Sequence, residues 1–182
     1  MLRLFFALRP TAEQGARLME TALPLLTALQ TPPAPVSNLH ATLSFVGAVA
    51  PERLDALRAA AAGIRAQRCE LEFDVFEYWD KPRILCAAAS RESAEASALA
   101  VALRDAAIAA GFAPDIKPFR AHLTLGRKIP AASAEKFVWP QRIWPGFVVR
   151  GDHFALMQSR RDGSQSIYSV VDEWPLYEKE VC

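Results

Sequence analysis

The sequence contains few of the residues that disulfide frameworks and metal centres require. Its three cysteines, Cys69, Cys86 and Cys182, are odd in number and form no C-x-x-C pair, so neither a disulfide framework nor a zinc knuckle is indicated. This cysteine usage fits a reducing compartment and predicts a cytoplasmic protein. The chain also lacks a G-x-x-x-x-G-K phosphate loop, an H-E-x-x-H metal site and a G-x-S-x-G nucleophile elbow, which argues against the enzyme classes built on them.

The chain also lacks an excess of either charge and any long apolar run. Its 182 residues carry 21 Lys and Arg against 20 Asp and Glu, whereas proteins that coat long nucleic acid usually carry a strong basic excess. A small phosphorylated ligand is compatible with this balance. No apolar segment approaches the roughly 20 residues that span a bilayer, and the amino end makes a poor signal peptide, so we expect no membrane association. The 52% hydrophobic content supports a real core.

One short pattern occurs twice. Segment 38–47 reads N-L-H-A-T-L-S-F-V-G, and segment 119–128 reads F-R-A-H-L-T-L-G-R-K, so two of only three histidines begin His-x-Thr-Leu. Both segments have the apolar, Thr-bearing texture of a short strand. A single His beside a Thr is usually an ordinary polar pair on a sheet surface. Two copies, 82 positions apart, instead predict two similar half-domains that face one another.

Strand geometry divides each copy into a chemical face and a packing face. Alternate side chains share a face, so His40 should point the same way as Thr42, and His122 the same way as Thr124. The opposite, apolar face should pack against a core covered by helices. Its members are Ala41, Leu43, Phe45, Leu123 and Leu125.

The other segments predict a mixture of helices and strands. Thr11 and Gln14 form a capping-box pattern that opens a helix, Pro51 opens a second helix, and a third, over 91–110, ends at Gly111. We expect the first motif strand to end at Gly47, and segment 129–145 to be a loop that packs as a lid. Further strands are expected over 2–8, 70–78, 83–89, 146–158 and 165–171, the last two joined by a hairpin. This order predicts an α+β chain, with residues 1–182 forming one domain of two pseudo-equivalent lobes.

Two histidines that face each other across a cleft can perform acid–base chemistry. The ordinary pKa of histidine, about 6.5, allows one imidazole to act as a base and another as an acid near neutral pH. The threonine hydroxyls can donate to nonbridging phosphate oxygens. This set suits hydrolysis of a strained phosphodiester, in which one imidazole takes a proton from water while the other protonates the departing alkoxide.

At these residues the chain resembles the two-histidine phosphoesterase superfamily, and most closely its RNA 2′,3′-cyclic phosphodiesterases, also called 2′-5′ RNA ligase-like proteins. The resemblance extends from R-L-F-F-A-L at the start, through both motif segments, to S-R-R-D-G-S-Q-S-I-Y near the end. It implies a bilobal α+β fold with two pseudo-symmetric antiparallel-rich sheets, flanking helices and a central cleft. It further implies no metal or other cofactor, a monomer, and an RNA 3′ end or a small cyclic nucleotide as substrate. The implied reaction converts a terminal 2′,3′-cyclic phosphate to a 2′-phosphate.

The same resemblance implies roles for individual residues. His40 corresponds to the proton donor to the leaving 3′ oxygen and His122 to the acceptor that activates water, while Thr42 and Thr124 correspond to phosphate-binding hydroxyls. Arg127 matches an arginine that commonly follows the second motif. Simple alternation would place Arg127 on the face of Leu125, so its reach into the cleft requires a bulge or a strand end. Two positions depart from the family pattern without removing a reacting group, Ala41 and Ala121.

Alternative functions remain open at this point. They are a 2′-5′ phosphodiesterase or ligase, a phosphodiesterase of cyclic ADP-ribose phosphates, and a non-catalytic module that binds RNA ends. His153 has no Thr partner and is expected to be structural. Scattered cations around the second motif could steer an anionic end, namely Lys117, Arg120 and Lys128. Several aromatic residues could stack on a base, although we expect most of them to be core: Phe5, Phe45, Phe119, Trp79 and Trp144.

Overall fold

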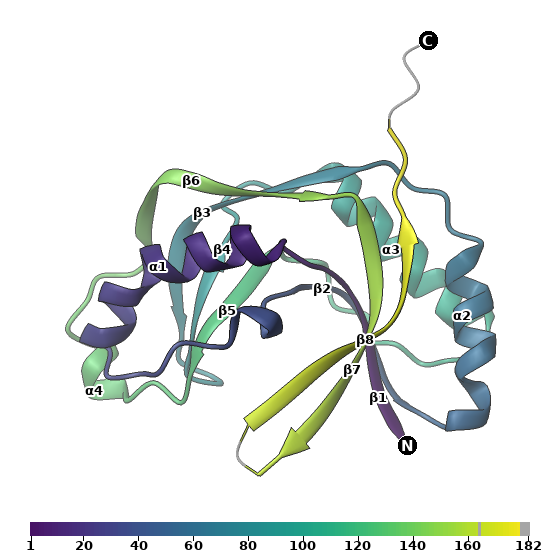
Figure 1. The fold of residues 1–182 in the computed structure, drawn as a ribbon, viewed down its shortest axis with the longest axis horizontal. Coiled ribbons are helices and arrows are strands. Elements are labelled where there is room, and N and C mark those ends of the chain that lie inside the picture. Colours follow the sequence, from purple (N-terminus) through teal and green to yellow (C-terminus); the bar gives the residue numbers. More distant parts are fainter. Residues whose placement is uncertain (164, 179–182) are drawn as a thin grey trace.

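The computed structural model describes residues 1–163 and 165–178, which form two four-stranded sheets and the helices around them (Figure 1). Cys182 lies outside the described residues. In chain order the elements are β1 (Leu2–Leu8), α1 (Ala12–Ala28), η1 (Val36–Asn38), β2 (Ala41–Val49), η2 (Pro51–Arg53), α2 (Leu54–Ala62), β3 (Cys69–Trp79), β4 (Ile84–Ala88), α3 (Ala94–Ala109), β5 (His122–Arg127), α4 (Ala131–Ala134), β6 (Gln141–Gly151), β7 (His153–Asp162) and β8 (Gln165–Pro175).

Each motif strand belongs to a different sheet. The first sheet has the order β2-β1-β7-β8 and the second has the order β5-β4-β3-β6. All the pairings within the two sheets are antiparallel, which confirms the expected α+β fold with two antiparallel sheets. β1 is a central strand, as its apolar sequence predicts, because a strand covered on both faces needs apolar side chains on both. The first sheet thus carries the Thr42 strand and the second the Thr124 strand.

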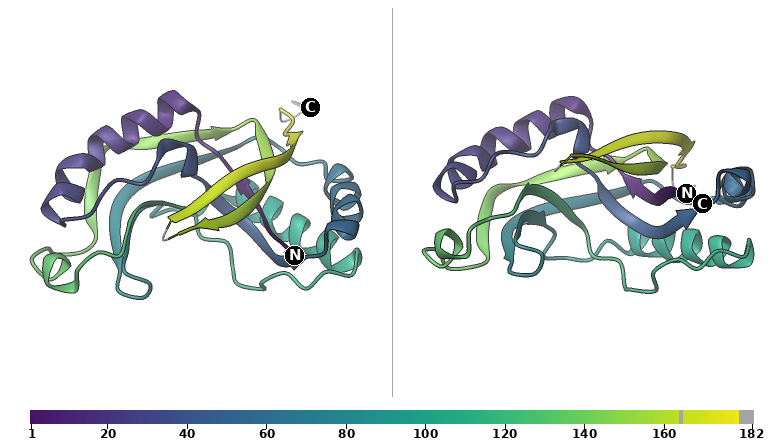
Figure 2. Two further views of the ribbon diagram at one scale, coloured as in Figure 1. Left: turned by 60° about the horizontal axis from the view of Figure 1, so that its bottom comes forward. Right: turned by 90° about the horizontal axis from the view of Figure 1, so that it is seen from below.

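The helices hold the two sheets together. Helix α1 follows β1 of the first sheet but contacts β5 of the second, and α3 follows β4 of the second sheet but contacts β2 of the first. Figures 1 and 2 show α1 along one face of the second sheet, and α2 and α3 together at the other end of the molecule. A single cluster of buried apolar side chains runs through both sheets. The position of one motif strand relative to the other therefore depends on a shared core.

Local capping signals in the sequence are borne out. The Thr11 side chain accepts a hydrogen bond from the Gln14 amide while the Gln14 side chain accepts one from the Thr11 amide. This capping box satisfies two amides that a helix end leaves free. Helix α1 continues through Pro24 to Ala28, and Gly111, with a φ of 77°, follows the end of α3. Within the described residues, no helix is long and apolar enough to cross a membrane.

Three expectations about the strands are wrong. Gly47 does not end β2, which continues to Val49; its φ of 93° accommodates an irregularity inside the strand. Segment 129–145 is not a lid, because it contains α4 and the first residues of β6, which pair with β3. Segment 146–158 is not one strand: it divides at Asp152 between β6 of the second sheet and β7 of the first.

The part of β6 around Pro145 is accommodated by a break in its pairing with β3. Arg142 pairs with Val75, and the next paired residue on β6 is Phe147, which lies opposite Phe73. The intervening residues, which include Trp144 and Pro145, lie outside the ladder. A proline has no amide to donate, so it fits the bulge of an edge strand better than a regular ladder. This explains why the segment reads as a loop although its ends belong to a strand.

Candidate active site

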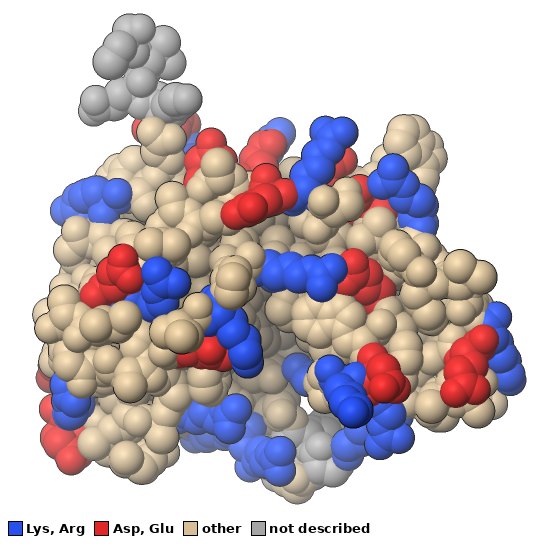
Figure 3. Space-filling view, turned by 180° about the vertical axis from the view of Figure 1, so that it is seen from behind, with Lys and Arg blue, Asp and Glu red and all other residues tan. Residues whose placement is uncertain are grey.

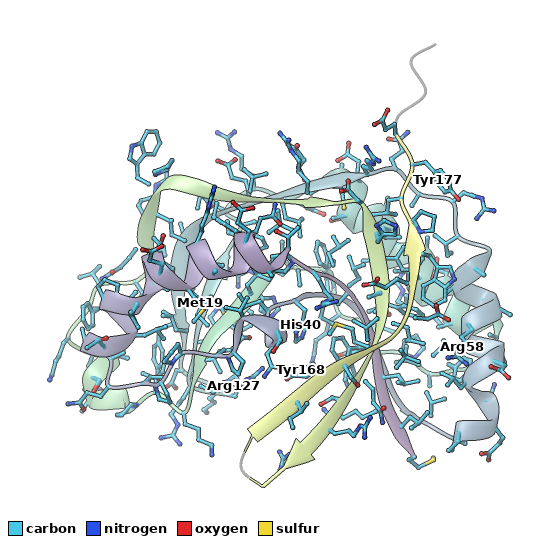
Figure 4. The ribbon with its side chains drawn as sticks, viewed as in Figure 1. Met19, His40, Arg58, Arg127, Tyr168 and Tyr177 are labelled. Atoms are coloured by element: carbon cyan, nitrogen blue, oxygen red, sulfur yellow. The ribbon has the colours of Figure 1, made fainter. Side chains whose placement is uncertain are left out.

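The two motif strands contribute to a single pocket of about 460 Å³ between the sheets. His40 lies immediately before β2 and His122 is the first residue of β5. Figure 4 shows His40, Arg127 and Tyr168 gathered between β5 and the β7–β8 hairpin. All five residues expected at the site line this pocket, together with seven others. The complete lining is Arg3, Phe5, His40, Thr42, Phe45, His122, Thr124, Arg127, Ser159, Arg161, Ser166 and Tyr168.

A bulge follows the threonine in each motif strand. The pairing of β2 with β1 passes from Thr42–Ala7 to Ser44–Phe6, which leaves Leu43 as an extra residue. The pairing of β5 with β4 passes from Thr124–Cys86 to Gly126–Leu85, which leaves Leu125 as an extra residue. One extra residue reverses the alternation beyond it.

The bulges decide which side chains reach the pocket. Arg127 lines the pocket because the bulge at Leu125 supplies the break in alternation that this position requires. Phe45 was expected on the core face with Leu43, and that expectation is wrong. The bulge at Leu43 turns Phe45 toward the pocket. Phe45 and Arg127 therefore occupy corresponding positions, five residues after each histidine.

Both imidazoles are anchored in the same way. The Nδ1 atom of His40 lies 2.7 Å from the Asn38 carbonyl oxygen, and the Nδ1 atom of His122 lies 2.8 Å from the Arg120 carbonyl oxygen. A carbonyl oxygen can only accept, so each Nδ1 carries a proton and donates it. In the neutral ring the unprotonated nitrogen is then Nε2. Each ring is thus held by the backbone two residues earlier, with its second nitrogen available for proton transfer.

His40 is packed among aromatic rings. Its ring centroid lies 4.8 Å from that of Phe5 and 4.6 Å from that of Tyr168. Burial in these surroundings lowers the pKa of His40 from its ordinary 6.5 to about 4, although the hydrogen bond to Asn38 opposes the shift and the charge of Arg127 reinforces it. Burial disfavours the charged form of an imidazole. In the free protein His40 is therefore a neutral imidazole at neutral pH.

His122 has more polar surroundings. Its ring centroid lies 4.6 Å from that of Trp79, and Arg120, whose carbonyl anchors it, donates to both carboxylate oxygens of Glu77 at 2.7 and 2.8 Å. The Trp79 indole N–H donates to Glu77 at 2.8 Å. Burial lowers the pKa of His122, the Arg120 carbonyl and the Glu77 charge oppose this shift, and Arg120 and Arg127 reinforce it. The Arg120–Glu77 ion pair thus supports the backbone anchor of His122, whereas His40 packs against the rings of Phe5 and Tyr168.

The two buried cysteines are not candidates for nucleophilic chemistry. Burial raises the pKa of Cys69 to about 11 and that of Cys86 to about 12, so both remain thiols at neutral pH, whereas the thiolate is the reactive form. Cys86 lies beneath the second motif, with its sulfur 4.0 Å from the Thr124 hydroxyl oxygen. Within residues 1–163 and 165–178, no group of three His, Cys, Asp or Glu side chains could hold a metal.

Most of the remaining sequence candidates do not line the pocket. His153, which was expected to be structural, begins β7 at a solvent-exposed position and does not line the pocket. Trp144 is 93% exposed on β6, and Phe119 and Lys117 line a separate hollow beside α3. Lys128 lines a hollow next to the pocket, walled by the prolines of segment 32–35. Of the aromatic candidates, Phe5 and Phe45 are the two that line the pocket.

The β7–β8 hairpin supplies pocket residues that the sequence analysis missed. Ser159 and Arg161 come from β7, and Ser166 and Tyr168 come from β8. The Tyr168 hydroxyl accepts a hydrogen bond of 3.4 Å from Arg127 and so links the two sheets. Arg3 of β1 was also missed. A signal was available for Ser166 and Tyr168, which alternate along the predicted strand 165–171 and so share one face. Ser159 and Arg161 lie beyond the predicted strand 146–158, because β7 extends to Asp162.

Comparison with known proteins gives consistent results. Residues 10–163 match the sequence model of the 2′-5′ RNA ligase superfamily. The chain is 28% identical over 174 residues to the RNA 2′,3′-cyclic phosphodiesterase of Escherichia coli K12, and the match covers 96% of each chain. The crystal structure of E. coli LigT complexed with 3′-AMP superposes with a TM-score of 0.82 at 26% identity, covering 96% of this chain and 98% of that one. The structure of TT0787 from Thermus thermophilus has a TM-score of 0.78 at 26% identity and covers 98% and 100%.

Proposed function

Because this chain belongs to the 2′-5′ RNA ligase superfamily, we propose that it is a metal-independent RNA 2′,3′-cyclic phosphodiesterase that opens terminal cyclic phosphates to 2′-phosphates. One observation supports this proposal above all: two histidines with the same backbone anchor reach one pocket from different sheets. We regard the sheets as two pseudo-equivalent lobes of one domain, each of which contributes one His-x-Thr strand. The E. coli complexes with 3′-AMP, ATP and NADP+ support a nucleotide as ligand.

The proposed reaction is a single in-line displacement at phosphorus. His122 accepts a proton from water through Nε2 as the water oxygen bonds to phosphorus. The bond from phosphorus to the 3′ oxygen breaks, and His40 donates its Nε2 proton to that oxygen, so the product carries a 2′-phosphate and a 3′-hydroxyl. Thr42 and Thr124 donate hydrogen bonds to the nonbridging oxygens. Arg127 provides positive charge where negative charge develops in the transition state.

The role of His40 as the acid imposes a condition on the bound state. An imidazole can donate the leaving-group proton only if it enters the reaction doubly protonated. Since burial lowers the pKa of His40 to about 4 in the free site, the proton has to arrive together with the negative charge of the substrate. The negative charge of the bound cyclic phosphate thereby favours the doubly protonated form of His40, which is the form that can act as the acid.

The test is hydrolysis of an RNA that ends in a 2′,3′-cyclic phosphate, in the presence of a chelator. His40→Ala and His122→Ala should each lower the rate by roughly 10² to 10⁴, the usual size of a general acid–base contribution. His153→Ala is the matched control, since this histidine does not line the pocket, and it should keep the wild-type rate. Undiminished turnover in both pocket variants would rule out the assignment. A 3′-phosphate product would show that the other bond breaks, and retained binding without hydrolysis would identify a module that only binds RNA ends.

A further inference from the structure

The pocket carries more positive charge than a single cyclic phosphate requires. Arg3, Arg127 and Arg161 line it, and none of its described lining residues is acidic. A 2′,3′-cyclic phosphate is a diester with one negative charge. Arg127 lies close enough to both histidines to lower the pKa of each, which places its charge at the reacting phosphate. The terminal cyclic phosphate then has no further negative charge that could pair with Arg3 and Arg161.

The described ion pairs of the protein do not use these arginines. Arg120 is paired with Glu77, Arg142 with Asp74 and Arg150 with Glu70, whereas none of the ion pairs between described side chains includes Arg3, Arg127 or Arg161. Figure 3 shows Lys and Arg side chains gathered along the lower margin of the molecule, around the hollow there. Arginines in a concave site that form no ion pair with a described carboxylate are suited to bidentate recognition of phosphate.

Arg3 is separated from His40 by a row of aromatic rings. The guanidinium of Arg3 lies 4.8 Å from the ring centroid of Phe45. Phe45 is stacked on Phe5 with centroids 6.5 Å apart, and the Phe5 centroid is 4.8 Å from that of His40. Along β1, Arg3 is two residues from Phe5, a separation of about 7 Å. The Arg3 charge therefore lies farther along the pocket than the reacting position.

Arg161 lies near Arg3 on the neighbouring strand. Ser159 of β7 pairs directly with Arg3 of β1, and Arg161 is two residues further along β7 on the same face. Diagonal neighbours of this kind on antiparallel strands have Cα atoms about 7 to 8 Å apart. The side chains of Arg3, Ser159 and Arg161 all line the pocket. Two cations and a hydroxyl thus share one end of it.

From this arrangement we propose that Arg3 and Arg161 form a second phosphate subsite, which binds the phosphodiester that precedes the terminal cyclic phosphate. The proposal rests on the proposed function for the place of the terminal phosphate. The preferred substrate is then an oligonucleotide end, and a cyclic mononucleotide is a poorer one. A positively charged groove that follows a nucleic-acid backbone is a common way to bind single strands without reading their sequence.

Calorimetric binding of product-like ligands tests the subsite without requiring turnover. The probes are a dinucleotide that ends in a 2′-phosphate and its analogue with a neutral methylphosphonate at the internal link. A hydrogen-bonded charge contact corresponds to roughly 10-fold to 100-fold in affinity, so the wild type should bind the charged dinucleotide at least about tenfold more tightly. Arg3→Gln and Arg161→Gln should each reduce this ratio, and each should lower the salt dependence of binding by about one ion.

Arg160→Gln is the matched control. Arg160 is exposed, is adjacent in sequence to Arg161 and does not line the pocket. Arg160→Gln changes the net charge by the same amount as Arg161→Gln, but it should leave the ratio of the two dinucleotide affinities as in the wild type. Circular dichroism establishes that each variant is folded. Equal binding of the charged and neutral dinucleotides by the wild type would overturn the subsite, as would an equal loss in Arg160→Gln and Arg161→Gln. A ratio that persists in a protein unable to open cyclic phosphates would instead contradict the proposed function alone.

Discussion

A bound phosphate ligand should raise the pKa of His40, which burial lowers in the free protein. The perturbation is the addition of a nucleoside 2′-monophosphate, a product-like ligand, to the free protein. In the free site His40 packs against the rings of Phe5 and Tyr168, and its pKa is lowered from 6.5 to about 4. An anion placed between the two histidines favours the protonated ring, so the ligand should raise the pKa of His40.

The magnitude decides whether the effect matters near neutral pH. The lowering from 6.5 to about 4 corresponds to about 3 kcal/mol against the charged ring. One negative charge about 4 Å away contributes about 4 kcal/mol in favour of that ring at an effective dielectric constant of 20. The two contributions are of similar size. The ligand should therefore convert His40 from a neutral ring into one that is substantially protonated near neutral pH.

Nitrogen–proton correlation NMR of the histidine side chains measures this directly. His40→Asn and His122→Asn assign the signals, and His153, which lies outside the pocket, is an internal control whose signals should not respond to the ligand. Inosine without phosphate should also leave the His40 signals unchanged, which separates charge from simple occupancy. The reasoning fails if His40 is already protonated at neutral pH in the free protein, or if the phosphate ligand does not shift its titration upward.

Two further predictions concern the surroundings of the histidines. Glu77→Gln should weaken the support of the Arg120 carbonyl that anchors His122 and lower kcat by about tenfold, within the 10²-fold that a misplaced group can cost. Glu70→Gln, which loses an ion pair on the same strand outside the pocket, should not change kcat, and equal kcat values for the two variants would contradict the positioning role. The depressed pKa of His40 means that the unfolded chain binds a proton near pH 6.5 that the folded chain takes up only near pH 4. The contribution of the neutral His40 ring to the free energy of unfolding should therefore be fully present above about pH 6.5. The free energy of unfolding should fall by about 3 kcal/mol on acidification to about pH 4. Urea titrations of His40→Asn should lack this fall.

Local signals in the sequence were sufficient to predict most elements. The capping box at Thr11 and Gln14, the apolar strand 2–8 and the hairpin after β7 each depend on a few neighbouring residues. The meeting of His40 and His122 in one pocket could also be anticipated, because a repeated pattern half a chain apart indicates two related halves. The chemical roles of these residues stay predictions that the proposed variants test.

Features that depend on pairing partners could not be predicted in the same way. Periodicity assigned Phe45 to the core because nothing local marks the extra residue at Leu43, which exists only relative to β1. Segment 146–158 reads as one strand, yet its two parts join different sheets. The division arises because the first part pairs with β3 and the second part pairs with β1. The Arg3 side of the pocket was missed for a related reason, since Arg3 and Arg161 meet only when β1 and β7 pair.

The paired bulges have a consequence for how such a protein can diversify. His and Thr precede the extra residue in both strands, so their geometry is established before the irregularity begins. The side chain two residues beyond the extra residue points into the pocket but does not hold either imidazole. This position is Phe45 in the first motif strand and Arg127 in the second. Substitution of Phe45 can therefore change which molecules are accepted while the two proton-transferring groups stay in place, whereas substitution of Arg127 would also remove positive charge from the reacting position.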